Sequence, residues 1–134
     1  MKYRSISEAA AAFHIPESTL RYYEKQGLLP LMERDEAGRR LFSDNQMALL
    51  GTVIRLKNTH MPISSIKRYI DWILEGESTL EKRLEMMNKH KQTVLDEIAL
   101  MTESLAGIDV KITNYTKRIQ ERRSEDKLMR EEEQ

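Results

Sequence analysis

Residues 18–25 form the densest group of side chains in the chain that could bind a ligand. They are, in order, Ser18, Thr19, Leu20, Arg21, Tyr22, Tyr23, Glu24 and Lys25. At helical spacing Leu20 turns inward and the polar side chains spread over the outer side. Arginine can fork onto a phosphate or a guanine edge, and hydroxyl groups donate to phosphates. The segment therefore suits DNA contact, although spacing alone fits an ordinary amphipathic surface helix equally well.

Two short helices are expected to position this segment. Ser5-Ile6-Ser7-Glu8 is a capping box, and the alanine run that follows has high helix propensity and permits close helix packing. This helix must end before Pro16. A second helix is predicted from Pro16 to Gln26, closed at Gly27 by a left-handed cap. Two short helices joined by a tight turn predict a helix-turn-helix.

A hairpin is predicted next, over residues 31–42, which we call the wing. Asp35-Glu36-Ala37-Gly38 has the residue types of a turn, and Arg39-Arg40-Leu41-Phe42 has those of a return strand. A helix pair follows. Ser43-Asp44-Asn45-Gln46 reads as another capping box, residues 58–62 break the pattern, and Gly76 ends the second helix.

From Leu80 to Ile119 apolar residues follow a strict heptad, broken only by Lys91. Such a stripe needs a partner helix, because the globular part of the chain lies at its other end. We therefore predict a homodimeric coiled coil, less secure beyond Gly107. The residues expected to form the dimer contact, here called the seam, are Leu84, Met87, Val94, Ile98, Met101, Leu105, Ile108 and Ile112.

Together these patterns predict a mainly α-helical protein with three parts. Residues 1–76 form a winged helix-turn-helix with a short β-hairpin wing and a helix pair. Residues 77–121 form the long C-terminal dimerisation coiled coil. Residues 122–134 are charged, have no apolar period and are expected to be disordered.

Composition narrows the function classes. The 134 residues contain no cysteine and have a net charge of zero, while residues 1–60 hold nine Lys or Arg against seven acids. No phosphate loop, catalytic triad or paired-carboxylate motif is present, so we expect no enzyme and no cofactor. The three histidines lie far apart in the sequence, which argues against a metal site. No signal peptide or membrane span is readable, so a cytoplasmic, nucleoid-associated protein is expected.

The motifs resemble one known family. Thr19-Leu20-Arg21-Tyr22-Tyr23-Glu24, followed by Gly27-Leu28-Leu29-Pro30, is similar to the signature of MerR family transcription regulators. Gly38-Arg39-Arg40-Leu41-Phe42-Ser43 resembles the Gly-Tyr-Arg wing motif of that family. The specific motifs cover residues 3–76, and residues 77–120 match only as a dimerisation helix. His14 replaces a usual glycine between the first helices, and Arg39 replaces the wing tyrosine.

The resemblance implies a function and a contact surface. Such regulators bind a pseudo-palindromic operator as homodimers, sit between promoter elements and distort the DNA, and so affect RNA polymerase indirectly. Arg21, Tyr22 and Tyr23 would contact DNA from the helix, and Arg40 from the wing. The full set of expected DNA-binding residues is Ser18, Thr19, Arg21, Tyr22, Tyr23, Lys25, Arg39 and Arg40.

We expect this protein to sense signals without the cysteine chemistry that many members of the family it resembles use. Residues 57–63, with Trp72, resemble the aldehyde- and electrophile-responsive branch, whose members often carry one sensing cysteine. Arg55 stands at that place here, so thiol chemistry does not carry over. Tyr69, Trp72 and Met86 could line a pocket for an apolar effector, although such residues are more often core.

Two rival functions remain open. An architectural or recombination-accessory protein uses the same winged fold to bend DNA, but a fixed dimer favours one palindromic site. A coiled-coil adaptor without a DNA role fits the long helix alone. The Thr19–Glu24 run and the wing argue against the adaptor.

Overall fold

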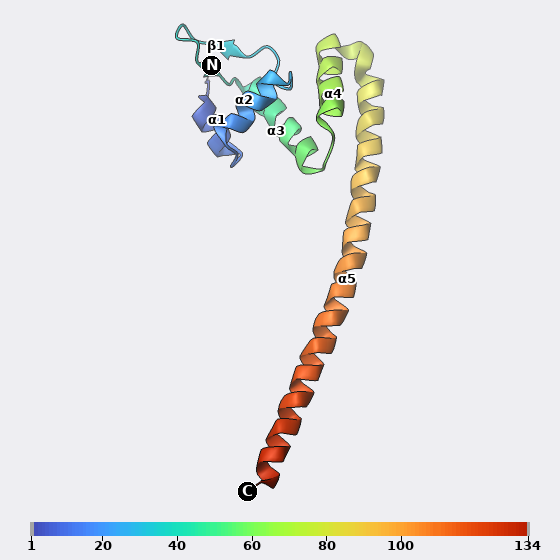
Figure 1. Cartoon of the computed structure of the whole chain (residues 1–134). Helices are drawn as coiled ribbons and strands as arrows, with labels where there is room; N and C mark the ends of the chain where they lie inside the picture. The colour runs from blue at the N-terminus through green and yellow to red at the C-terminus, as the bar shows by residue number, and fades with distance from the viewer. Residues whose placement is uncertain (1, 134) are drawn as a thin grey trace. The chain divides into compact units, whose positions relative to one another are not determined.

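A computed structural model describes residues 2–133 of the chain, which divide into two compact units (Figure 1). The first unit is Met1–His90 and the second is Lys91–Gln134. The first unit contains all elements up to the start of the last helix, and the second is the remainder of that helix. The first turns of the last helix pack with the globular core through Met86 and Met87. The predicted division at residue 76, between the DNA-binding part and the dimerisation helix, stays a prediction.

The helix-turn-helix forms as the capping residues predict. Helix α1 spans Ile6–Ala12, and both hydrogen bonds of the Ser5–Glu8 capping box are present. Helix α2 spans Glu17–Lys25 with Pro16 as its N-cap. Ala9 is fully buried where α1 meets α2, as the alanine run predicts. His14, in the turn between them, has a φ of +56°, the left-handed backbone that favours glycine.

The wing is a two-stranded antiparallel hairpin. Strand β1, Glu33–Arg34, pairs with β2, Arg40–Leu41, in the register Glu33 to Leu41 and Arg34 to Arg40. The turn between them is closed by Asp35, whose Oδ1 accepts the backbone N–H groups of Ala37 and Arg39 at 3.0 and 2.8 Å. Gly38 has a φ of +82° in this turn. The predicted hairpin and turn are thus confirmed.

Helices α3, Asp44–Asn58, and α4, Ile63–Glu75, form the predicted pair. Ser43 caps α3 by accepting the backbone N–H of Gln46 at 3.1 Å. The second half of the predicted capping box is wrong, since the buried side chain of Gln46 instead donates to the carbonyl of Pro30 at 2.7 Å. This bond ties α3 to the segment that leaves α2.

The core of the first unit draws on the four helices α1 to α4 and on the segments that flank the two strands. Its fully buried large side chains come from α2, α3 and α4, from the segment after α2 and from the end of the wing. They include Leu20, Leu28, Leu29, Phe42, Leu50, Val53, Ile66 and Ile70. Phe42 is held in place by backbone hydrogen bonds in both directions with Arg4, which add the N-terminal segment beside β2.

A compact joint connects α4 to α5. Gly76, at a φ of +95°, precedes a 3-10 turn, η1, over Glu77–Thr79, and α5 begins at Leu80. The buried Thr79 hydroxyl donates to the carbonyl of Trp72 at 2.6 Å. Arg83 donates to that hydroxyl and to the carbonyl of Gly76. These bonds fix the first turn of α5 against α4.

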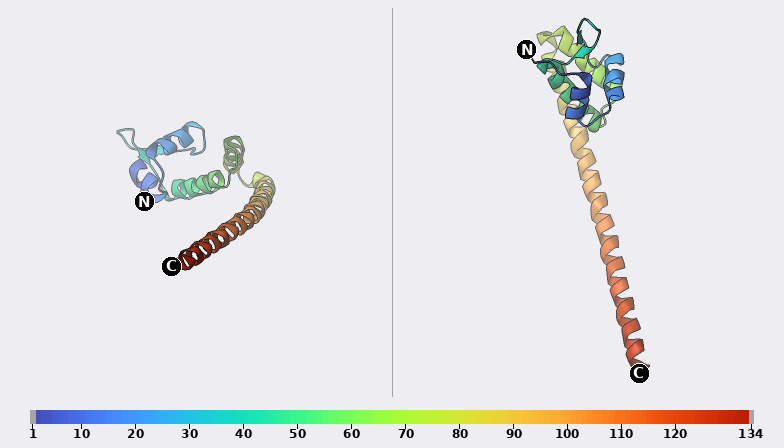
Figure 2. Two further views of the ribbon diagram at one scale, coloured as in Figure 1. Left: turned by 60° about the horizontal axis from the view of Figure 1, so that its bottom comes forward. Right: turned by 90° about the vertical axis from the view of Figure 1, so that its left-hand side faces the viewer.

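Helix α5, Leu80–Glu132, is one uninterrupted helix of 53 residues, about 80 Å long (Figures 1 and 2). It continues through Gly107 and includes residues 122–132, for which the sequence predicted disorder. Arginine, glutamate, lysine, leucine and methionine dominate this segment, and all are strong helix formers. Among the residues that the structure describes, no helix is long and apolar enough to cross a bilayer.

Candidate nucleic-acid interface

Helix α2 has one buried and one exposed face. Leu20 is fully buried, as the helical spacing predicts. Four of the predicted DNA-binding side chains of α2 are exposed, and Thr19 is half-buried at the edge of this face. The exposed ones are Ser18, Arg21, Tyr22 and Lys25. This face of α2 thus presents two cations and two hydroxyl groups, which match the phosphate and base-edge chemistry of a DNA groove.

Tyr23 does not belong to the exposed set. Only 8% of its surface is accessible, and it packs with the core, whereas Tyr22 beside it is 43% exposed. Burial raises the pKa of the Tyr23 phenol, which therefore stays neutral in the physiological range. Tyr23 lies one turn from Leu20 on the inward side of α2, and its contact with DNA, which the resemblance implies, stays a prediction.

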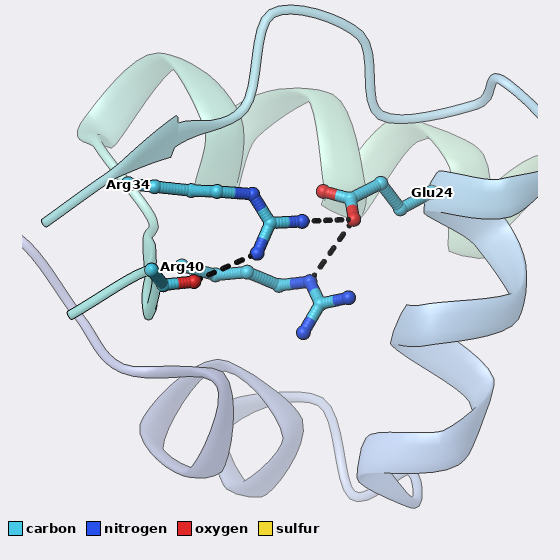
Figure 3. Close-up of polar contacts among 4 residues, drawn as sticks. Glu24, Arg34 and Arg40 are labelled. Carbon is cyan, nitrogen blue, oxygen red and sulfur yellow. Dashed lines mark hydrogen bonds and ion pairs between the residues drawn. The ribbon is translucent and has the colours of Figure 1, made fainter.

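Glu24 connects α2 to the wing (Figure 3). Its Oε1 accepts from Arg34 Nη2 at 2.8 Å and from Arg40 Nε at 3.1 Å, so two guanidinium groups share one carboxylate oxygen. Arg34 also donates from Nη1 to the carbonyl of Gly38 at 2.9 Å. The side chains of Glu24 and Arg40 are largely withdrawn from solvent, whereas those of Arg34 and Arg39 are 43% and 80% exposed.

The two predicted wing arginines differ in how they are held. Arg40 binds Glu24 through Nε alone, and its two terminal nitrogens point away from that carboxylate in Figure 3. Within residues 2–133 these nitrogens have no hydrogen-bond partner, so they can fork onto an anion. Arg39 pairs with Asp35 at 2.9 Å. The backbone N–H of Arg39 is the main cause that lowers the pKa of the Asp35 carboxyl, and its guanidinium adds to the effect.

Sequence reasoning missed Arg34 and the role of Glu24. The predicted turn at 35–38 would place residue 34 opposite residue 39, whereas in the structure five residues separate Arg34 from its strand partner Arg40. Side chains directly opposite in a hairpin lie on one face of the sheet. Two neighbouring cations repel each other unless an anion lies between them. In this fold the anion is Glu24, which forms ion pairs with both arginines.

The seam lies along the exposed side of α5. Six of its residues are more than half exposed in the single chain, Val94 is half-buried, and Met87 packs against the core of the first unit. The six are Leu84, Ile98, Met101, Leu105, Ile108 and Ile112. A soluble helix rarely exposes an apolar stripe of this length without a partner. The next positions of the heptad, Arg122 and Asp126, are charged, so the apolar stripe ends before the helix does.

Two of the three predicted effector-pocket residues come together. Trp72 of α4 and Met86 of α5 line the same surface pocket in the first unit, whereas Tyr69 packs against the core and is not among the lining residues. No group of three or more His, Asp or Glu side chains among residues 2–133 could hold a metal ion.

Comparisons with known proteins agree with this geometry. Residues 4–72 match the family described as MerR HTH family regulatory protein. The chain is 36% identical over 111 residues to an HTH-type transcriptional regulator of Haemophilus influenzae, covering 83% of this chain and 82% of that protein.

Solved structures give the same result. A MerR family transcriptional regulator from Bacillus thuringiensis has a TM-score of 0.80 and 40% identity, over 84% of this chain and 99% of that one. HiNmlR, a MerR family regulator lacking the sensor domain and bound to promoter DNA, has a TM-score of 0.81 and 34% identity, over 87% and 92%. The winged helix-turn-helix, the long helix and these matches together show that the chain belongs to the MerR family of DNA-binding transcription regulators.

Proposed function

We propose that the protein binds a pseudo-palindromic promoter operator as a homodimer and controls transcription by distorting the DNA between the promoter elements. It would thereby act on RNA polymerase indirectly. The observation that carries the proposal is the cross-link by Glu24, which holds the wing arginines beside the exposed face of α2. The helix and the wing then form one cationic surface rather than two loosely connected ones.

Each residue of this surface has a distinct task in the proposal. Arg21 binds a phosphate at the edge of the groove and Tyr22 lies beside it, with Ser18, Thr19 and Lys25 at the margins of the same face. Arg40 binds phosphate through its free terminal nitrogens, and exposed Arg39 adds a second, weaker contact. HiNmlR, which is similar over nearly its whole length, is bound to promoter DNA in its crystal structure.

Dimerisation through the seam would give the protein two-fold symmetry. Two copies joined through it would carry two recognition surfaces related by a two-fold axis, and such a dimer reads two half-sites of an inverted repeat. DNA bent or twisted between the half-sites costs deformation energy, which the contacts of both wings would offset.

Selection from a random DNA library distinguishes this proposal from the alternative of an architectural DNA-bending protein. The full-length protein is used to enrich bound duplexes, and the enriched site is then placed at varied positions in longer fragments to measure bending by gel mobility. We expect a two-fold symmetric motif whose centre is distorted. Enrichment of bent DNA without a shared sequence would contradict the proposal and favour an architectural protein.

A further inference from the structure

A surface pocket of about 430 Å³ lies between α4 and the first turns of α5, within the first unit. This volume is in the range of small-molecule sites. Two residues of α4 and four of α5 line it: Arg68, Trp72, Lys82, Glu85, Met86 and Lys89. The indole and the thioether are its apolar surface, and charged groups surround them.

The walls of the pocket are held in a fixed relation. The Thr79 hydroxyl donates to the carbonyl of Trp72 at 2.6 Å and to that of Gly76 at 2.8 Å. Arg83 donates to the Thr79 oxygen at 3.1 Å. The same joint therefore positions the backbone of Trp72 and the helix that carries Met86. A preformed pocket of this kind loses little conformational entropy when a ligand binds.

The seam leaves this pocket open to solvent. At 3.6 residues per turn, Lys82 lies about 200° around the helix from both Leu80 and Leu84, on the opposite side from the heptad stripe. Lys89 occupies the same heptad position one repeat later. A partner helix on the seam would thus cover Leu84 and not the pocket. Contact through the seam alone would therefore leave the site accessible.

The charges in the pocket select for an anion. Three cations and one carboxylate line it, a net charge of +2, although the whole chain is neutral. Glu85 is paired with Lys89 at 3.3 Å. Arg68 and Lys82 have no hydrogen bond or ion pair to any of residues 2–133. Two unpaired cations beside an indole and a thioether match a molecule with an aromatic ring and an acidic group.

We propose that this pocket is a binding site for a small aromatic carboxylate. The ring packs against Trp72 and Met86, and the carboxylate lies between Arg68 and Lys82. This goes beyond operator binding, because the site lies on α4 and α5 and uses none of the residues assigned to DNA. A ligand here would contact both helices at the joint between the DNA-binding unit and the dimerisation helix.

The experiment is a titration of the full-length protein with phenylacetate, in the absence of DNA. Trp72 is the single tryptophan of the chain, so its fluorescence reports the pocket alone, and calorimetry provides an independent affinity. The neutral phenylacetamide and the cationic 2-phenylethylammonium have the same ring. We expect saturable binding of phenylacetate with a change in Trp72 emission, and affinities at least about tenfold weaker for both analogues.

Substitutions locate the site. Arg68→Gln and Lys82→Gln each remove one unpaired cation and should weaken phenylacetate binding about tenfold or more, with unchanged melting temperature. Lys117→Gln is the matched control, an exposed lysine of α5 at the same heptad position as Lys82, and should bind as the wild type does. Absence of saturable binding, equal affinity for the three ligands, or equal weakening in the control would overturn the proposal.

Discussion

A single carboxylate determines how the wing presents its cations. Glu24 carries one negative charge against two guanidinium groups, so the group keeps a net charge of +1. Arg34 is also bound to the Gly38 carbonyl, while Arg40 keeps two free nitrogens. An acid within a DNA-binding surface would ordinarily repel phosphate. Here its position between two arginines favours an ordering role over a repulsive one.

Replacement of the Glu24 carboxylate distinguishes its ordering of the arginines from its repulsion of phosphate. Glu24→Gln removes a negative charge from the surface, which by electrostatics alone should strengthen DNA binding. We expect the opposite, a loss of about tenfold in operator affinity, because the neutral amide would no longer offset the charges of Arg34 and Arg40, which would then repel each other. Glu36→Gln, an exposed acid at the tip of the wing, is the control and should bind as tightly as the wild type or slightly tighter. Tighter binding by Glu24→Gln would refute the ordering role.

The pH dependence of the free energy of unfolding tests the Ser5–Glu8 capping box of α1. The Ser5 backbone N–H is the main cause that lowers the pKa of Glu8 below its ordinary 4.5, and the Ser5 hydroxyl adds to it. A lowered pKa in the folded state gives stability that is fully present above the ordinary pKa and lost as pH falls through the lowered one. Urea unfolding as a function of pH should therefore show a smaller acid loss for Glu8→Gln than for the wild type. The same acid loss in both would contradict this role of Glu8.

At the scale of the elements, the sequence predicted most of the first unit because local signals coincide there. The Ser5 capping box, Pro16 and the turn residues at 35–38 each act over a few residues, and each element formed near its expected bounds. The misplaced features depend on tertiary contact. The Gln46 side chain binds the Pro30 carbonyl instead of completing its capping box. Tyr23, which the resemblance assigns to DNA contact, is buried against the core one turn from Leu20.

Two glycines test the end of α2 and the interior of α5, because replacement by alanine should change stability in opposite directions at the two positions. Gly27 ends α2 at a φ of +79°, and an added Cβ would lie 2.6 Å from Lys67 Cε. Gly27→Ala should cost about 1–2 kcal/mol, mainly through the backbone, since the lysine chain can move. Gly107 lies inside α5 with nothing within 4 Å, so Gly107→Ala should stabilise by up to about 1 kcal/mol. Thermal unfolding at one protein concentration measures both, and changes of the same sign would contradict the assignment.

At the scale of the whole molecule, the exposed apolar seam of α5 is the surface that the proposed dimer would cover. Heptad periodicity predicts the seam, because apolar residues recur at every third or fourth position from Leu80 to Ile119, with Lys91 as the exception. The end of the helix was less predictable, since charged residues with high helix propensity extend it beyond the seam. Membership of the aldehyde- and electrophile-responsive branch stays a prediction, as does the site-by-site assignment of DNA contacts.

Dimerisation can be tested with one substitution on the seam and one beside it. Ile98→Asp would place an uncompensated charge in the buried contact, costing several kcal/mol, so sedimentation should show a monomer. Leu100, similarly exposed in the single chain, lies off the seam, and Leu100→Asp should leave the dimer intact. A dimeric Ile98→Asp variant, or equal disruption by both, would contradict the seam.

The central claim is that the outer face of α2 binds operator DNA, and the salt dependence of affinity tests it most directly. The wild type and Arg21→Ala are titrated onto the selected inverted repeat over a series of salt concentrations, with Arg123→Ala as an exposed-arginine control on α5. Each phosphate contact contributes about 0.9 to the slope of log affinity against log salt, so a dimer lacking Arg21 should have a slope shallower by about 1.8 and a weaker affinity. The control should match the wild type. An Arg21→Ala variant with the affinity and slope of the wild type would contradict the claim.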